Sequence, residues 1–160
     1  PIAFDVGKLL GNLLMSWFAQ PGHETTPGER ADYRRWILET VEGVWSGFDA
    51  KFRALWRERR TGDAFPEAML PTGSPAFARA QDQLMGRIYR DALGFAGCAM
   101  IRRTLGLAHN ADMETIADPR RRAERERVNL ELAIELIRTP DRFPDIASVT
   151  ARAAALDGVE

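Results

Sequence analysis

The first twenty residues carry the pattern that most restricts how this chain can fold. Apolar residues recur at helical spacing and predict a helix from about Asp5 to Gln20; they are Val6, Leu9, Leu10, Leu13, Leu14 and Trp17. On a helical wheel the polar residues Asp5, Lys8, Asn12 and Ser16 fall within roughly 80° of one another. A helix with so narrow a polar stripe is mostly buried, so further elements must surround it. The stripe itself must face something polar.

A second, longer helix is expected after a turn at Gln20 to Gly28. Thr26, Pro27 and Glu29 form a helix-start signal of N-cap, first-turn proline and capping-box glutamate. The helix is predicted to continue to about Arg60. Its apolar stripe consists of Tyr33, Trp36, Ile37, Val41, Val44, Trp45, Phe48, Phe52, Leu55 and Trp56. We interpret the stripe as core packing rather than a ligand cage, because it keeps helical spacing throughout.

The rest of the chain also favours helices. Proline and glycine predict a loop over Thr61 to Gly73, and further helical segments begin at Ser74-Pro75, near Asp112, at Asp118-Pro119 and near Pro144. In the segment that begins at Pro119 we expect the inward residues to be Ala123, Leu130, Ala133, Ile134 and Ile137. We find no strand pattern. The predicted fold class is therefore all-α, with about five to seven helices in a single domain over residues 1–160.

Two adjacent arginines are the best candidates for a functional role. Arg102 and Arg103 follow Ala92 to Ile101, ten residues without a charge. Adjacent residues on a helix point about 100° apart, so both guanidinium groups cannot turn away from buried surroundings. At least one should find an anionic or polyhydroxyl partner. The structural alternative is that both sit at a helix C-terminus and pair with surface carboxylates.

The other candidates are weaker. Asp5 is either an N-cap or first-turn acid of the first helix, or an anchor that holds the backbone of another loop. His109 is expected to hydrogen-bond locally, and Cys98 to be a buried, unreactive thiol. The basic run Arg120 to Arg127 is interrupted by glutamates and is interpreted as a solvated helix face.

Composition excludes several classes of function. Lys and Arg total 22 against 23 Asp and Glu, so no bulk charge favours nucleic acid or an anionic membrane. One cysteine and two histidines leave no disulfide framework and no His/Cys metal cluster. The longest apolar runs are shorter than the roughly 20 residues of a membrane span, so we expect a cytoplasmic protein. Because Pro1 is followed almost at once by a strongly patterned helix, we expect the C-terminal part of a longer polypeptide.

Three stretches resemble a known enzyme family. They are FDVGKLLGNLLMSWFAQ (4–20), WILETVEGVWSGFDAKFRALW (36–56) and DALGFAGCAMIRRTLGLAH (91–109). They are similar to the C-terminal lobe of bacterial S-methyl-5-thioribose kinases, with the third stretch the most specific. The first is shared more loosely with choline kinases and aminoglycoside phosphotransferases, which have the same protein-kinase-like fold.

The resemblance implies an enzyme that transfers the γ-phosphoryl group of ATP, with Mg²⁺, to the anomeric hydroxyl of methylthioribose in methionine salvage. It places the nucleotide lobe, the catalytic aspartate and the metal-binding motif before this chain, so the chain alone should bind no cofactor and be inactive. It makes Arg102 and Arg103 substrate-binding residues and Asp5 a brace of the catalytic loop. It also suggests a homodimer.

Two alternatives stay open. One is the C-terminal lobe of another kinase of this fold, with a choline, aminoglycoside or sugar acceptor. A choline site calls for an aromatic cage and acidic residues, whereas an arginine pair favours an anionic or hydroxyl-rich ligand. The other alternative is a non-catalytic helical interaction module.

Overall fold

The computed structural model describes residues 1–60, 62 and 64–158, and this part of the chain is helical without strands. Its α-helices are α1 (Ile2–Ala19), α2 (Ala31–Glu58), α3 (Pro75–Leu105), α4 (Ala111–Glu114), α5 (Pro119–Arg138) and α6 (Ile146–Asp157). Two 3₁₀ turns complete it, η1 (Gln20–His23) and η2 (Pro140–Arg142). The prediction of an all-α fold is confirmed. The irregular segment between α2 and α3 was also predicted, although Thr61 and Asp63 lie outside the described residues.

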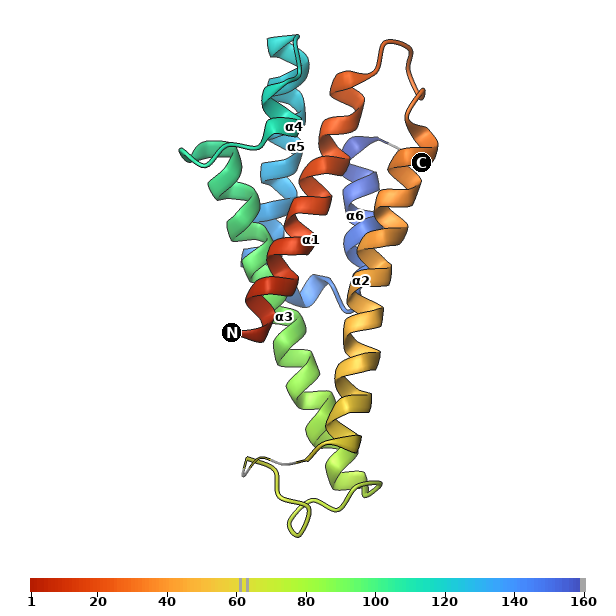
Figure 1. Cartoon of the computed structure of the whole chain (residues 1–160). Helices are drawn as coiled ribbons and strands as arrows, with labels where there is room; N and C mark the ends of the chain where they lie inside the picture. Colours follow the sequence, from red (N-terminus) through yellow and green to blue (C-terminus); the bar gives the residue numbers. More distant parts are fainter. Residues whose placement is uncertain (61, 63, 159–160) are drawn as a thin grey trace.

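The bundle is built around α1. This helix packs against α2, α3 and α5, while α6 covers the space between α2 and α5 (Figure 1). At the lower end of Figure 1, α2 and α3 extend beyond α1 and join through the 59–74 loop. By length and composition alone, the segment Ile2–His23 could cross a membrane, but half of its apolar window is buried in the fold. The core helix of a globular bundle has the same properties.

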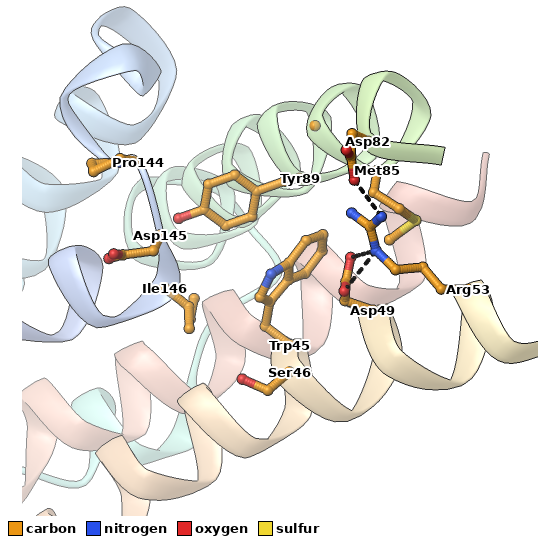
Figure 2. Close-up of a pocket in the computed structure, with 11 residues that line it drawn as sticks. Trp45, Ser46, Asp49, Arg53, Asp82, Met85, Tyr89, Pro144, Asp145 and Ile146 are labelled. Carbon is orange, nitrogen blue, oxygen red and sulfur yellow. Dashed lines mark hydrogen bonds and ion pairs between the residues drawn. The ribbon is translucent and has the colours of Figure 1, made fainter. Parts of the chain in front are cut away.

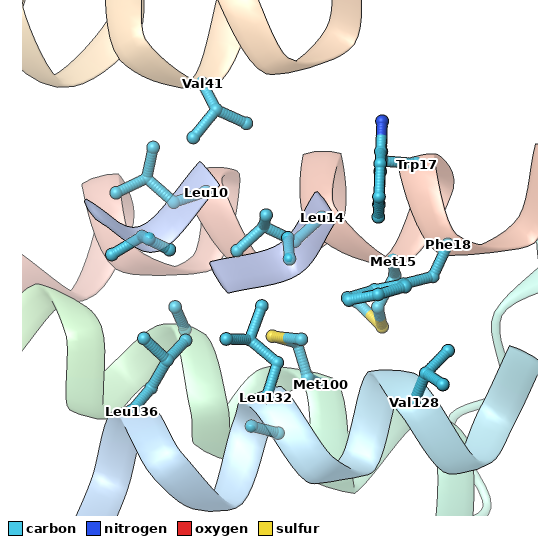
Figure 3. Close-up of a cluster of buried hydrophobic side chains, with 14 of the residues drawn as sticks. Leu10, Leu14, Met15, Trp17, Phe18, Val41, Met100, Val128, Leu132 and Leu136 are labelled. Carbon is cyan, nitrogen blue, oxygen red and sulfur yellow. The ribbon is translucent and has the colours of Figure 1, made fainter. Parts of the chain in front are cut away.

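Buried apolar side chains of α2, α3 and α5 meet those of α1 in one core cluster (Figure 3). They include Leu10, Leu14, Met15, Trp17 and Phe18 of α1, Val41 of α2, Met100 of α3, and Val128, Leu132 and Leu136 of α5. Burial of such side chains contributes about 1.5–3 kcal/mol each. The prediction of a mostly buried first helix is confirmed.

Close contacts at glycine fix the position of α3 between two neighbours. A Cβ on Gly11 of α1 would lie 2.8 Å from the carbonyl oxygen of Ala96, and one on Gly7 would clash with that of Ala92. On the opposite side, a Cβ on Gly97 would lie 2.5 Å from the carbonyl oxygen of Ala133 in α5. The backbones of α1 and α5 therefore both approach the backbone of α3.

At the projecting end of α2 and α3, a buried arginine closes the connecting loop. Arg60 is almost fully buried and its guanidinium lies 4.4 Å from the ring centre of Phe77. It donates to the backbone carbonyl groups of Phe65 (2.5 Å) and Leu70, and to the hydroxyl of Thr72 (3.2 Å). One side chain thus holds the connecting loop against the start of α3.

The predicted helix starts at Ser74-Pro75 and Asp118-Pro119 are correct, whereas the first helix begins at Ile2 instead of Asp5 and the second begins late for a clear reason. Ser74 caps α3 by accepting from Phe77 N (3.1 Å), and Asp118 caps α5 by accepting from Arg120 N (2.8 Å). At the second helix Glu29 does accept from Thr26 N (3.1 Å), as a capping box requires. However, Gly28 has φ +83°, which is not helical, so α2 begins only after it.

The aromatic stripe of α2 is core only in part. Ile37 and Val41 are buried. Further along, Trp45, Phe48 and Phe52 are partly buried against a second core cluster, which consists of Ala3, Met85, Ile88 and Ala92. Tyr33 and Trp36 are about half exposed and stack on each other, with ring centres 5.6 Å apart. Core packing is therefore correct for the middle of the stripe and wrong for its N-terminal end, where Tyr33 and Trp36 are exposed to solvent.

The predicted inward face of α5 is wrong at most positions. Of the five expected core residues only Ala133 is buried; Ile134 and Ile137 are 45% and 39% exposed. The observed core face carries Val128, Leu132 and Leu136 instead, together with two polar residues. These are Arg125 and Asn129, whose side-chain N–H groups find acceptors inside the bundle.

Candidate functional site

The two candidate arginines lie in the last turn of α3 and differ in their surroundings. Arg102 is exposed, whereas Arg103 is half-buried. Within the described residues, neither guanidinium forms an ion pair with a carboxylate. The structural alternative, in which Arg102 and Arg103 pair with surface carboxylates, is therefore not observed among these residues. The C-terminus of α3 favours their positive charges through the helix dipole.

Arg103 has one partner and one free donor. Its Nη2 donates to the backbone carbonyl of His109 (3.2 Å), across the loop that follows α3. Its Nε is buried and has no hydrogen-bond partner in the described part of the chain. A buried guanidinium donor without an acceptor is costly.

The loop that follows the arginines is held at both ends. Gly106 closes α3 through its N–H to the carbonyl of Arg102 (3.0 Å), and Asn110 caps α4 by accepting from Asp112 N (2.9 Å). Between them, His109 Nδ1 lies 3.1 Å from Glu114 Oε1, so its predicted local interaction is confirmed. Leu107 beside it is 97% exposed.

Beneath the arginines, a buried polar contact joins α3 to α5. Asn129 is fully buried and donates from Nδ2 to the hydroxyl of Thr104 (2.9 Å). That hydroxyl donates in turn to the carbonyl of Met100 (2.8 Å). The end of α3 is thereby fixed relative to α5 by a directed interaction, which positions the adjacent arginines. Sequence reasoning missed Asn129, because a single asparagine in a charged helix gives no signal.

Asp5 lies in the first turn of α1, so its role as a first-turn acid is confirmed. Its assignment as N-cap is wrong, because α1 begins at Ile2. Its carboxylate is exposed and accepts no hydrogen bond from the described residues. Lys8, Asn12 and Ser16, which share its stripe, are partly exposed, so the stripe lies at the surface of this chain.

The structure separates Asp5 from the arginines. Gly7 contacts Ala92 and Gly11 contacts Ala96, so α1 and α3 run in the same direction with an offset of 85 residues. By this offset Arg102 and Arg103 lie level with the end of α1, some twelve residues beyond Asp5. At 1.5 Å per residue the separation along the helices is roughly 18 Å. Asp5 and the arginine pair therefore cannot contact the same small group directly.

Two other sequence interpretations change. Cys98 is exposed on the outer face of α3 rather than buried. The run Arg120 to Arg127 is not simply a solvated face, because Arg121 donates to the carbonyl of Glu24 (2.9 Å) and Arg125 is buried.

Among the described residues, no group of three His, Cys, Asp or Glu side chains could hold a metal ion. The described residues therefore do not fit a Mg²⁺ site.

Comparison with known proteins defines first the class and then the family. No protein-family model matches the chain. Its relatives are kinases of small molecules by name. Methylthioribose kinase 1 of rice (Oryza sativa subsp. japonica) is 36% identical over 160 residues, covering 98% of this chain. The methylthioribose kinase of Escherichia coli is 38% identical over 149 residues, covering 93%.

A third relative, the methylthioribose kinase of Yersinia pseudotuberculosis, is 37% identical over 154 residues, covering 95% of this chain. The chain is thus related to methylthioribose kinases along almost its whole length, which confirms the resemblance drawn from the three stretches. It spans 37%, 36% and 35% of the three relatives, so the match concerns little more than a third of each protein.

Proposed function

We propose that this chain is the substrate-binding C-terminal part of a methylthioribose kinase. The observation that carries the proposal is 36–38% identity to such kinases over 93–98% of the chain. The intact enzyme would transfer the γ-phosphoryl group of ATP to the anomeric hydroxyl of S-methyl-5-thioribose. Residues 1–160 would act as one domain within it and be inactive alone.

Arg102 and Arg103 are assigned to the sugar and to the charge that develops during transfer. Phosphoryl transfer depends mainly on positioning and on stabilising negative charge spread over the phosphoryl oxygens. Two guanidinium groups without carboxylate partners, on a helix end fixed by Asn129 and Thr104, suit this role. In the described part of the chain the Nε donor of Arg103 has no acceptor, so this side chain keeps unused hydrogen-bonding capacity.

Asp5 is assigned as a positioning residue that braces the catalytic loop through its exposed carboxylate. The calculated separation from the arginines supports a division of labour, in which Asp5 acts on the loop and not on the sugar. ATP and Mg²⁺ are assigned to the preceding part of the polypeptide, which is the first partner of this chain. We further assign the intact enzyme to the cytoplasm, as a homodimer.

The decisive experiment offers the full polypeptide ATP, Mg²⁺ and a panel of acceptors. We expect transfer to methylthioribose, with a product phosphorylated on the anomeric oxygen by ³¹P nuclear magnetic resonance, and no transfer to choline or kanamycin. Transfer to choline or kanamycin but not to methylthioribose would establish a different kinase of this fold. A folded full-length protein that phosphorylates none of them would contradict the proposal and favour an interaction module.

A further inference from the structure

A cavity of about 450 Å³ lies where α2 and α3 diverge beside the start of α6 (Figure 2). Its walls come from Trp45, Asp49 and Arg53 of α2, Asp82 and Tyr89 of α3, and Asp145 before α6. Tyr89 precedes Arg102 by thirteen residues of one continuous helix, which corresponds to roughly 20 Å. The cavity is therefore separate from the site assigned to the sugar, and its volume suits a small molecule.

Two aromatic rings form one wall of the cavity. Trp45 and Tyr89 have ring centres 4.7 Å apart, with their planes tilted by 52°. Both side chains are half-buried and project into the space between α2 and α3 (Figure 2). The electron-rich faces of such rings attract cations, most strongly where water is partly excluded.

The charged groups of the cavity give it a negative balance. Asp49 and Asp82 both accept hydrogen bonds from Arg53, at 2.9 Å and 2.6 Å, on one side of the rings. Asp145 lies on the other side, where one carboxylate oxygen caps α6 by accepting from Ser148 N (2.8 Å). Three carboxylates and one guanidinium line the cavity, so it favours a cationic ligand over an anionic one.

The hydroxyl of Tyr89 is an unused acceptor at this position. Its oxygen is buried and has no hydrogen-bond partner in the described part of the chain. Burial raises the pKa of Tyr89 above its ordinary value, and the charge of Asp145 adds to this effect, so the phenol stays neutral. Figure 2 shows the hydroxyl directed toward the Asp145 side of the cavity. A ligand with N–H donors would satisfy this oxygen.

We propose that this cavity binds a small organic ammonium ion. Its N–H groups donate to the Tyr89 hydroxyl oxygen and the Asp145 carboxylate, and its charge lies against the rings of Trp45 and Tyr89. This inference is independent of phosphoryl transfer, because it concerns a second site on the same chain.

The test is isothermal titration of the full polypeptide with putrescine, a four-carbon primary diammonium ion. The neutral control ligand is 1,4-butanediol, which has the same chain with hydroxyl ends. We expect saturable binding of putrescine and none of butanediol. Tyr89→Phe and Asp145→Asn should each weaken putrescine binding at least about tenfold, the loss expected for one hydrogen bond to a charged group. Asparagine is as good an N-cap as aspartate, so the second variant keeps α6 intact.

Tyr33→Phe is the matched control, because Tyr33 is the other tyrosine of the chain and is exposed far from the cavity. It should bind putrescine like the unmodified protein. Tyr89→Phe should melt at the same or a higher temperature, since it removes a buried hydroxyl without a partner. Absence of putrescine binding, equal binding of butanediol, or full binding by both cavity variants would each overturn the proposal.

Discussion

Arg125 of α5 donates a hydrogen bond to the buried carboxylate of Asp157, the last residue of α6. Arg34 of α2 donates to the other oxygen of the same carboxylate, and its guanidinium lies 4.3 Å from the ring centre of Trp17 in α1. One carboxylate therefore joins three helices, next to the central one. A buried ion network of this kind contributes little net stability when intact, but breaking it leaves charges without partners.

Asp157→Ala should destabilise the fold strongly. Two largely buried guanidinium groups would lose their common acceptor, which corresponds to a loss of about 3–5 kcal/mol in the free energy of unfolding. Urea denaturation measures this change. Asp141→Ala is the control, because the Asp141–Arg90 pair is 76% and 63% exposed and should contribute less than about 1 kcal/mol. Similar effects of the two substitutions would show that the buried network is not structural.

Gly97→Ala and Gly94→Ala should change stability in opposite directions, although they lie one turn apart on α3. The Cβ at position 97 would meet the backbone of Ala133, so α3 and α5 must separate at a cost of about 1–3 kcal/mol. Position 94 faces open space, and alanine there should stabilise the helix by about 0.5–1 kcal/mol. Thermal melting of both variants tests the pair. A neutral Gly97→Ala would disprove close backbone contact.

Glu135 should make stability depend on pH in the acidic range. Hydrogen bonds from Arg152 of α6 (2.5 Å and 2.9 Å) lower the pKa of Glu135 in the folded protein. A lowered folded pKa stabilises the fold above the unfolded pKa, and the contribution is lost as the pH falls through the folded pKa. Glu135→Gln should therefore cost about 1 kcal/mol at pH 7 and progressively less as the pH falls through the folded pKa of Glu135. A cost that does not change between pH 7 and the acidic range would contradict this role.

Arg102→Ala and Arg103→Ala in the intact enzyme should each lower kcat/KM. The expected decrease corresponds to a loss of about 2–4 kcal/mol in transition-state stabilisation. Lysine should restore little, because an ammonium group cannot reproduce the planar donor geometry of a guanidinium. Steady-state kinetics beside a melting curve separates catalysis from stability. Arg87→Ala is a control on the exposed surface of the same helix. Normal kcat/KM in both arginine variants would contradict a role in catalysis and indicate that the two arginines only place positive charge at the end of α3.

Asp5→Ala in the intact enzyme should reduce kcat more than it raises KM, because the carboxylate positions a loop and does not touch the sugar. The control is Asp32→Ala, which removes the acidic residue in the first turn of α2. The side chain of Asp32 is 92% exposed. Both variants lose a similar helix-dipole contribution of about 0.3–1 kcal/mol. Steady-state kinetics should distinguish them. A KM effect alone, or equal kinetics in both variants, would contradict the assignment.

Local signals in the sequence were sufficient to predict where α3 and α5 begin. Ser74-Pro75 and Asp118-Pro119 combine a capping side chain with a proline whose missing N–H costs nothing in the first turn, and both helices begin there. The start of α2 was displaced because the pattern of Thr26, Pro27 and Glu29 does not reveal that Gly28 adopts a positive φ.

The face that a helix buries was harder to predict. In α5 the apolar residues Leu130, Ile134 and Ile137 form a regular stripe, yet the buried face includes Arg125 and Asn129. Those two are buried because Asp157 and Thr104, distant in sequence, supply their partners. Burial of polar residues depends on tertiary partners, which periodicity does not contain.

The arginine pair could be predicted from the sequence, whereas the cavity could not. Arg102 and Arg103 stood out because they end an uncharged segment, and the structure places them in the last turn of α3. The cavity beside Tyr89 gave no comparable signal, because Trp45, Tyr89 and Asp145 come from three segments and each fits a structural role. Of these three side chains, only Tyr89 has a buried hydroxyl without a hydrogen-bond partner in the described part of the chain, and the sequence does not reveal this.

The contacts at Gly7, Gly11 and Gly97 bear on how the arginines could evolve. Because main chain touches main chain on two sides of α3, the placement of its last turn does not depend on side-chain rotamers at those contacts. Core side chains nearby can then be exchanged without moving the guanidinium groups, whereas one added methyl group at Gly97 would shift the whole helix. Amide protons between Ala92 and Met100 should accordingly be among the slowest to exchange with deuterium.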